Sequence, residues 1–211
     1  MDYLAPYLPH LLLAWSIQFV GVISPGPSVA LILGVAVRDG RTPALAVAGG
    51  IASASLVLAV ATVLGLASLF AQGAGAMTLV RIIGGLYLLF LAYRAFRRAI
   101  TLPPLDLGSN DQGSVPRLIL AGFLLQLTNP KTLFFWMAVA ATGGVGDAPL
   151  PVIAVFVLGA FVNSFLGHGT YALMLSAAPF RTGYMAARRW IDTCLGGFFA
   201  YAGYRLMMEN D

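Results

Sequence analysis

The chain has 211 residues, of which 59% are hydrophobic and only 9% are charged. Soluble domains carry about 25% charged residues, and a soluble fold this apolar would expose large apolar patches. The composition therefore excludes a soluble enzyme, a disordered chain and a nucleic-acid-binding protein, despite a formal net charge of +4. It predicts an all-α integral membrane protein, with the lipid bilayer as its partner.

Apolar runs long enough to cross a bilayer follow one another along the chain. A spanning helix needs about 20 apolar residues, and turn-forming or charged segments separate the runs. The expected helices lie within residues 3–37, 42–71, 81–94, 116–142, 149–178 and 184–207. The sequence thus predicts one domain with six transmembrane helices, divided into residues 1–98, a loop over 99–115 and residues 116–211.

Arginines are distributed unevenly over the expected loops. The loops after the first, third and fifth helices hold Arg38, Arg41, Arg94, Arg97, Arg98, Arg117, Arg181, Arg188 and Arg189. The opposite side holds only Arg81 and Arg205, both near helix ends. Short cytoplasmic loops are rich in Lys and Arg, so these loops are expected in the cytoplasm and both termini outside. Because no Lys or Arg precedes Arg38, the first helix lacks the positive start of a signal peptide and is expected to be retained.

The two halves of the chain resemble each other weakly. Residues 19–25 resemble residues 124–130, which lie 105 positions later, and residues 85–94 resemble residues 196–205, which lie 111 positions later. Each half holds three expected helices, and an odd number places the second copy upside down in the membrane. Inverted repeats are typical of secondary transporters, whose sites lie near the bilayer midplane on broken helices.

Proline interrupts the first and fourth expected helices at corresponding positions. The first helix carries Pro25, Gly26 and Pro27, and the fourth carries Asn129 and Pro130. Proline has no N–H and cannot continue a helical hydrogen-bond ladder. Backbone groups freed at that depth must be satisfied by protein or line a wet cavity. The two breaks therefore predict a binding site near the midplane.

At these motifs the chain resembles the LysE/RhtB (lysine exporter / homoserine–threonine resistance) family of amino-acid exporters. The motifs are Pro-Gly-Pro at 25–27, a glycine-rich second helix near 40–50, and Asn-Pro-Lys at 129–131 followed by aromatic residues. Ser28 departs from the pattern, because the family usually has Asn there. The resemblance covers essentially the whole chain. It implies efflux of small amino acids or their derivatives across the bacterial inner membrane, driven by the proton motive force.

Lys131 is the charged residue expected deepest in the membrane, where a charge costs about 2.5–3.5 kcal/mol on insertion scales. It follows the second break and so belongs to the first turn of a half-helix. The free N–H groups and the dipole of such a turn favour an anion. Two roles stay open: Lys131 anchors a substrate carboxylate, or it takes up and releases the coupling proton.

The other candidates for substrate binding surround the breaks. They are Ser24, Pro25, Gly26, Pro27, Ser28, Gln126, Asn129 and Pro130. Ser24 and Asn129 precede the equivalent prolines, so each can contact substrate or simply cap a helix. Gln126 and Gln18 can point into a cavity or bond to a neighbouring helix, and the second interpretation is slightly favoured.

Three further titratable residues are candidates for proton coupling. His168 lies in the fifth helix, and imidazole titrates near neutral pH, although a structural hydrogen bond to a neighbour is the favoured interpretation. Asp192 follows Arg188 by four residues and Arg189 by three, so an ion pair within one helix is the favoured interpretation. Asp39 is flanked by arginines and is expected in a loop or at the cytoplasmic mouth.

Two other kinds of function compete with amino-acid export. An exporter of metal or another ion would need several intramembrane Asp, Glu, His or Cys ligands, whereas the deepest charge here is Lys131. A membrane enzyme would need catalytic motifs, but the sequence has no nucleophile–base pair, no phosphate-binding loop and no metal-ligand spacing. Thiol transfer would need a second cysteine besides Cys194. We therefore expect no enzymatic activity, metal or cofactor. A non-transporting subunit would not need two broken helices, and small residues over 49–53 could join helices within one chain or in a homo-oligomer.

Overall fold

The computed structural model describes residues 4–71, 74–102, 114–141, 145 and 148–208, without the side chains of 66–81, 84, 130, 141 and 206. All regular structure in this part of the chain is helical. The elements are η1 (Ala5–Tyr7), α1 (Leu8–Ile23), α2 (Pro27–Arg38), α3 (Arg41–Ala71), α4 (Ala74–Thr101), α5 (Val115–Thr128), α6 (Pro130–Ala141), α7 (Leu150–Ser176) and α8 (Ala178–Met208). The prediction of an all-helical protein is confirmed.

Both predicted breaks are present. The first expected helix is divided into α1 and α2, and the fourth into α5 and α6, whose axes are bent by 60°. Pro27 and Pro130 each open the helix after a break. Proline suits this position because its missing N–H would have no partner in the first turn. The loop predicted over 99–115 begins later than expected, since α4 continues to Thr101; residues 103–113 lie outside the described part.

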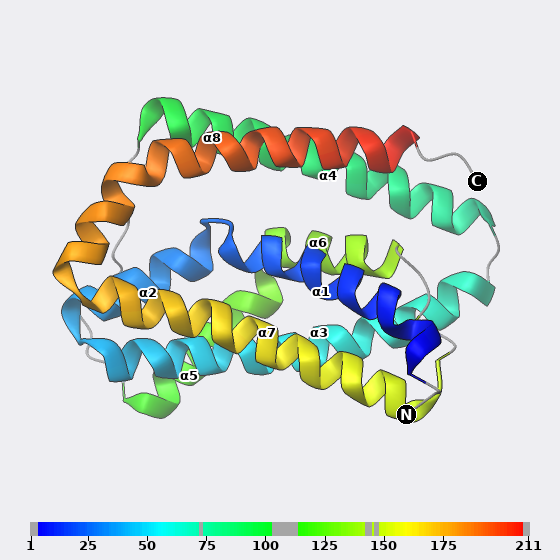
Figure 1. Ribbon diagram of the computed structural model, residues 1–211, viewed down its shortest axis with the longest axis horizontal. Coiled ribbons are helices and arrows are strands. Elements are labelled where there is room, and N and C mark those ends of the chain that lie inside the picture. The colour runs from blue at the N-terminus through cyan, green and yellow to red at the C-terminus, as the bar shows by residue number, and fades with distance from the viewer. Residues whose placement is uncertain (1–3, 72–73, 103–113, 142–144, 146–147, 209–211) are drawn as a thin grey trace.

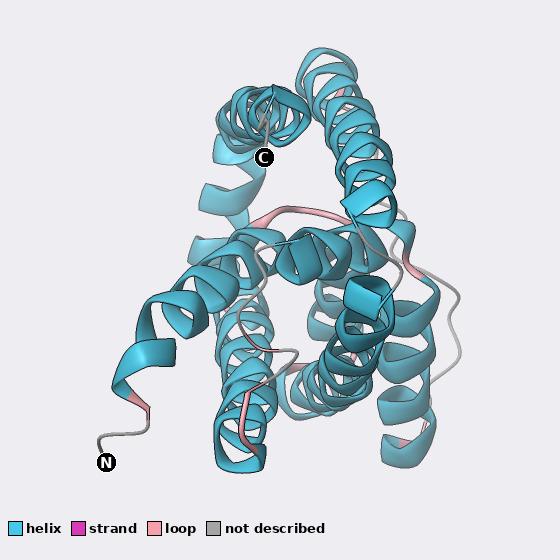
Figure 2. Cartoon of the chain, turned by 90° about the vertical axis from the view of Figure 1, so that its right-hand side faces the viewer, coloured by secondary structure: helices cyan, strands magenta, loops and turns pink. Residues whose placement is uncertain are grey.

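The helices run back and forth along the longest axis of the molecule (Figure 1). The ends that join α2 to α3, α4 to α5 and α7 to α8 lie together on the left of that view. The start of α1, the end of α3, the start of α4, the end of α6 and the end of α8 lie on the right. α4 and most of α8 lie side by side along one edge of the molecule, seen from the side in Figure 1 and nearly end-on in Figure 2.

Several helices have the length and apolar character of a membrane span. Among the described residues these are Ala5–Ile23, Arg41–Gly65 and Leu150–Ser176, and a fourth results if the bent pair α5 and α6 counts as one span. α7 also exposes Leu158, Val162 and Leu166, four residues apart on one face. The chain is therefore a multi-pass membrane protein, while the six-span arrangement stays a prediction.

Glycines let the helices approach closely at two crossings. A Cβ atom on Gly50 of α3 would collide with the carbonyl oxygen of Ile119 in α5. Where α4 crosses α8, a Cβ on Gly85 would lie 3.0 Å from the carbonyl oxygen of Gly203, and a Cβ on Gly203 would lie 2.8 Å from that of Gly85. Small residues at helix contacts are typical of membrane bundles. Gly50 thus packs α3 against α5 within the chain, whereas a Cβ on Gly49 would meet nothing within 4 Å.

Candidate functional site

The two helix breaks are in direct contact. Lys131, in the first turn of α6, donates a hydrogen bond from Nζ to the backbone carbonyl of Ser24 at 2.6 Å. In an unbroken helix that carbonyl would accept from the N–H of Ser28, but the chain is extended at Ser24 and Gly26. A cation is a strong donor to an orphaned carbonyl. Lys131, which lies at the second break, therefore supplies the hydrogen-bond donor that the first break lacks.

Gly26 provides the space for this contact. A Cβ atom placed on Gly26 would lie 3.2 Å from Nζ of Lys131 and 3.5 Å from its Cδ. That separation is tighter than ordinary van der Waals contact, so any larger residue would displace the ammonium group. The glycine between the two prolines is thus explained by the approach of Lys131.

Asn129 caps the half-helix α6. Its Oδ1 accepts the backbone N–H of Lys131 at 3.1 Å, and its carbonyl accepts the N–H of Leu133 at 3.1 Å. These bonds satisfy donors that a helix start leaves free. Pro130 follows in the first helical position, and its side chain lies outside the described residues.

The residues that precede the two equivalent prolines each bury a polar atom without a partner. Within the described part of the chain, Ser24 is 0% exposed and its Oγ has no hydrogen bond, and Asn129 is 4% exposed and its Nδ2 has none. A buried polar group left unpaired costs about 1–3 kcal/mol. Such atoms call for an explanation in a native structure, and a polar ligand is one.

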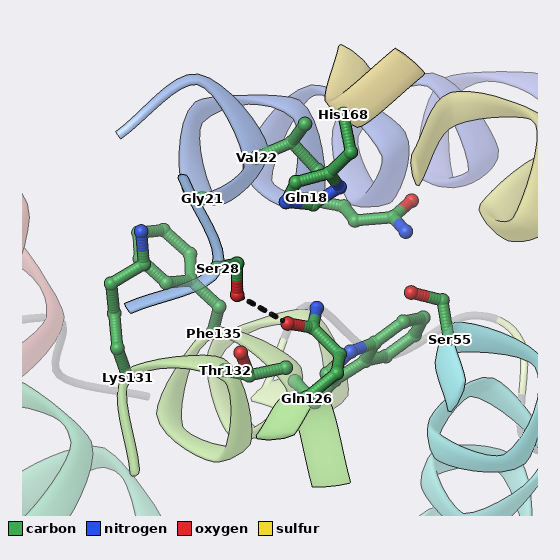
Figure 3. Close-up of a pocket in the computed structure, with 11 residues that line it drawn as sticks. Gln18, Gly21, Val22, Ser28, Ser55, Gln126, Lys131, Thr132, Phe135 and His168 are labelled. Carbon is green, nitrogen blue, oxygen red and sulfur yellow. Dashed lines mark hydrogen bonds between the residues drawn. The ribbon is translucent and has the colours of Figure 1, made fainter. Parts of the chain in front are cut away.

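A small polar cavity lies beside this contact. Its volume is about 20 Å³, enough for one or two water molecules. Figure 3 shows Ser28 and Gln126 facing each other across it, joined by a hydrogen bond of 2.9 Å from Ser28 Oγ to Gln126 Oε1. The lining residues are Gln18, Gly21, Val22, Ser28, Ser55, Gln126, Lys131, Thr132, Phe135, Trp136 and His168. The predicted site residues Ser28, Gln126 and Lys131 are brought together here.

The remaining polar residues of the cavity tie helices to one another. Gln18 donates from Nε2 to the carbonyl of Ala160 at 2.8 Å and accepts a hydrogen bond from Asn163 at 3.0 Å, which joins α1 to α7. Ser55 in α3 donates to Ser164 in α7 at 3.0 Å. Sequence reasoning missed Ser55 and Thr132 as wall residues. Small hydroxyl side chains within apolar helices are the signal that marks them.

His168 is buried at the cavity wall. Its Nδ1 lies 3.0 Å from the carbonyl oxygen of Ser164, one turn earlier in α7, and 3.3 Å from Oγ of the same serine. The hydrogen-bonded interpretation of this histidine is therefore realised. Proton transfer by His168 stays a prediction.

Asp192 and Asp39 lie away from this cavity. Asp192 is 0% exposed, and its Oδ1 accepts from Arg98 at 3.0 and 3.1 Å. This ion pair joins α8 to α4, because α4 and α8 pack against each other. Arg189, a predicted partner, instead donates to the carbonyl of Ala99 at 3.0 Å. Asp39 ends α2 and pairs with Arg38 at 2.9 Å.

Facing helix breaks around a buried polar site, in an apolar helical chain, are typical of secondary transporters. Residues 19–210 match the family described as LysE type translocator. The chain therefore belongs to the LysE family of membrane translocators, as the motifs at its two breaks indicate.

Relatives of the chain include proteins with named transport activities. It is 28% identical to the threonine efflux protein of Escherichia coli K12 over 92% of this chain and 95% of that protein. It is 24% identical to the leucine efflux protein of Klebsiella pneumoniae over 80% of this chain and 78% of that protein. It is also 24% identical to an uncharacterized membrane protein of Haemophilus influenzae over 92% and 94% of the two chains. No solved structure gives a significant match.

Proposed function

We propose that the protein is a secondary active exporter of small amino acids or their derivatives across the bacterial cytoplasmic membrane, driven by the proton motive force. The observation that carries the proposal is the hydrogen bond from Lys131 to the freed carbonyl of Ser24. A cation held by a single backbone carbonyl can exchange that partner for a substrate carboxylate. Relatives named for threonine and leucine efflux support an amino acid as the substrate.

The proposed architecture is six spans in two inverted repeats, with both termini outside. The alternation of helix ends in Figure 1 supports it. So does the packing, since α3 packs extensively on α7, and α4 on α8. In the proposed repeat each of these pairs joins a helix to its own counterpart, as a two-fold axis between the halves requires.

In the proposed mechanism the substrate carboxylate binds at the second break. Lys131 and the first turn of α6 supply positive charge, and Ser24 Oγ and Asn129 Nδ2 supply buried groups with no other partner. The central cavity of about 20 Å³ is smaller than any amino acid, so the helices must move apart for substrate to enter. Candidates to carry the coupling proton are Lys131, His168, Asp192 and Asp39.

Transport by purified protein in proteoliposomes tests the proposal. Vesicles loaded with radiolabelled L-threonine or L-leucine should release it faster with protein than without, and an imposed proton gradient should drive release against a concentration gradient. A protonophore should abolish the driven component alone. Release that equals that of protein-free vesicles for every amino acid tried would overturn the proposed function.

Labelling of single cysteines in Cys194→Ser protein tests the topology. A cysteine at residue 2 should react with an impermeant thiol reagent in intact cells, and a cysteine at Arg117 should react only after the membrane is opened. The reverse pattern would invert the assigned orientation and the direction of transport with it.

A further inference from the structure

A second and larger cavity lies on the other side of the first break. Its volume is about 180 Å³, and it is enclosed by the break itself, α2, α4 and α8. The lining residues are Pro25, Gly26, Pro27, Val29, Ala30, Leu33, Arg94, Arg98, Tyr184, Arg188 and Asp192. Because Arg94 is exposed, the cavity reaches the surface, at the end of the molecule that carries most of the arginines.

The cavity has a charged wall and an apolar wall. Arg94 and Arg98 from α4 face the cavity together with Arg188 and Asp192 from α8, whereas α2 contributes only apolar side chains. Asp192 is 0% exposed, and its Oδ1 is held by Arg98 at 3.0 Å. Its Oδ2 has no hydrogen-bond partner among the described residues. A buried carboxylate oxygen without a donor is a strong acceptor for a cationic group.

We infer that this cavity binds the head group of an α-amino acid with an uncharged side chain, with its ammonium on Asp192 Oδ2 and its carboxylate on Arg94. The inference rests on the proposed function and adds a second binding site. We call it the outer site because it lies nearer than the central cavity to the arginine-rich end of the molecule, which is the proposed cytoplasmic end. Only a ligand with both charges uses the free carboxylate oxygen and the guanidinium groups. The apolar wall of Val29, Ala30 and Leu33 suits an uncharged side chain.

Charge and size select among amino acids. Two guanidinium groups of α4, on Arg94 and Arg98, face one carboxylate here, so a second cationic group on the ligand, as in lysine, meets net repulsion. A cavity of about 150 Å³ accepts benzene in another protein, so 180 Å³ suits an amino acid of small or medium size.

The outer site is adjacent to the central cavity of about 20 Å³. Gly26 lines the larger cavity, and Lys131, which lines the smaller, reaches within 3.2 Å of the position that a Gly26 Cβ would take. The hydrogen bond from Lys131 to Ser24 therefore stands between the two cavities. An amino acid held by Asp192 lies next to the contact that must open for it to advance.

Ligands that lack either the ammonium group or the carboxylate test the proposed contacts with Asp192 and Arg94 separately. Binding of L-threonine to purified protein in lipid nanodiscs is compared with that of 3-hydroxybutyrate, which lacks the ammonium group, and of 1-amino-2-propanol, which lacks the carboxylate. Asp192→Asn should weaken threonine binding at least tenfold and leave 3-hydroxybutyrate unchanged. Arg94→Gln should weaken threonine at least tenfold and leave 1-amino-2-propanol unchanged. Arg97→Gln, outside the cavity at the same end, is the control.

A cavity-filling variant keeps the test valid if Asp192→Asn fails to fold. Ala30→Phe fills the apolar wall without changing a charge and should abolish binding, whereas Val37→Phe on the exposed side of α2 should not. Lys131→Met should still bind threonine at the outer site while its transport falls at least tenfold. Equal weakening of all three ligands, or binding lost in Lys131→Met, would overturn the outer site. Wild-type protein that neither binds nor transports any amino acid would instead overturn the proposed function.

Discussion

The two helix breaks satisfy their freed backbone groups in opposite ways. The second break is a single residue, Asn129, which caps α6 with its own side chain and carbonyl. The first break extends from Ser24 to Gly26 and takes its donor from Lys131, 107 residues away. The start of α6 is thus capped locally, whereas the first break depends on a side chain that other acceptors can attract. The first break is therefore the part of the site that can change when a ligand arrives.

The faces beside the two breaks also differ. α6 packs on α4, where Phe134 and Tyr87 stack with ring centroids 3.5 Å apart and planes 14° apart. The corresponding face between α2 and α8 holds the cavity of about 180 Å³ instead. Two repeats in the same conformation would pack alike. Here the face between α4 and α6 is closed, whereas the face between α2 and α8 is open. An alternating transporter requires this difference to reverse during its cycle.

Removing the charge of Lys131 should have the largest effect. Lys131→Met deletes a charge-assisted hydrogen bond, and such bonds contribute about 1.5–3 kcal/mol, so transport should fall by about 10- to 100-fold or more. Lys131→Arg keeps the charge and should retain part of the activity if the residue anchors a carboxylate. Arg does not deprotonate in proteins, so a proton carrier would fail in both variants. Efflux from proteoliposomes separates these outcomes, and normal coupled transport by Lys131→Met would end both roles.

Blocking the space at Gly26 should have the next largest effect. In Gly26→Ala the added methyl group would sit 3.2 Å from Nζ of Lys131 and push the ammonium group off the Ser24 carbonyl. We expect a roughly tenfold loss of transport, since about 1.4 kcal/mol corresponds to one tenth of the rate. Gly49→Ala, where a Cβ has nothing within 4 Å, is the matched control. Equal transport by the two alanine variants would show that the first break does not depend on this contact.

Loosening the closed face should shift the balance between conformations. Phe134→Ala removes the ring stack with Tyr87, and aromatic pairs are worth about 0.5–1.5 kcal/mol beyond their buried area. The ratio of molecules that are open on the side of α6 to molecules that are closed there should rise by about two- to tenfold. In protein with Cys194 replaced by Ser, a cysteine at Thr132 should then react faster with an impermeant reagent added from outside. Phe165→Ala, on the exposed face of α7, is the control, and an unchanged rate in Phe134→Ala would contradict the closed-face interpretation.

Local chemistry made part of this molecule predictable from sequence. Proline in the interior of an expected helix interrupts its hydrogen bonds whatever surrounds it, so both breaks and the cap at Asn129 could be predicted from residues adjacent in the chain. Contacts between helices do not. Nothing near Asp192 in sequence indicates Arg98, because their ion pair depends on how α4 crosses α8. The larger cavity was missed for the same reason, since its walls come from three helices that only the packing brings together.

The smallest expected effect separates the two breaks by stability. Asn129→Ala removes the cap on the Lys131 N–H and should lower the free energy of unfolding by about 1 kcal/mol. Ser24→Ala removes a buried hydroxyl that has no partner, so the free energy of unfolding should stay the same or rise slightly. Both variants should nevertheless weaken amino-acid binding, because each removes a polar atom assigned to the substrate. Thermal unfolding in detergent, with and without ligand, measures both quantities. A cap-like loss of stability in Ser24→Ala would show that its hydroxyl serves the fold, and the asymmetry between the breaks would then disappear.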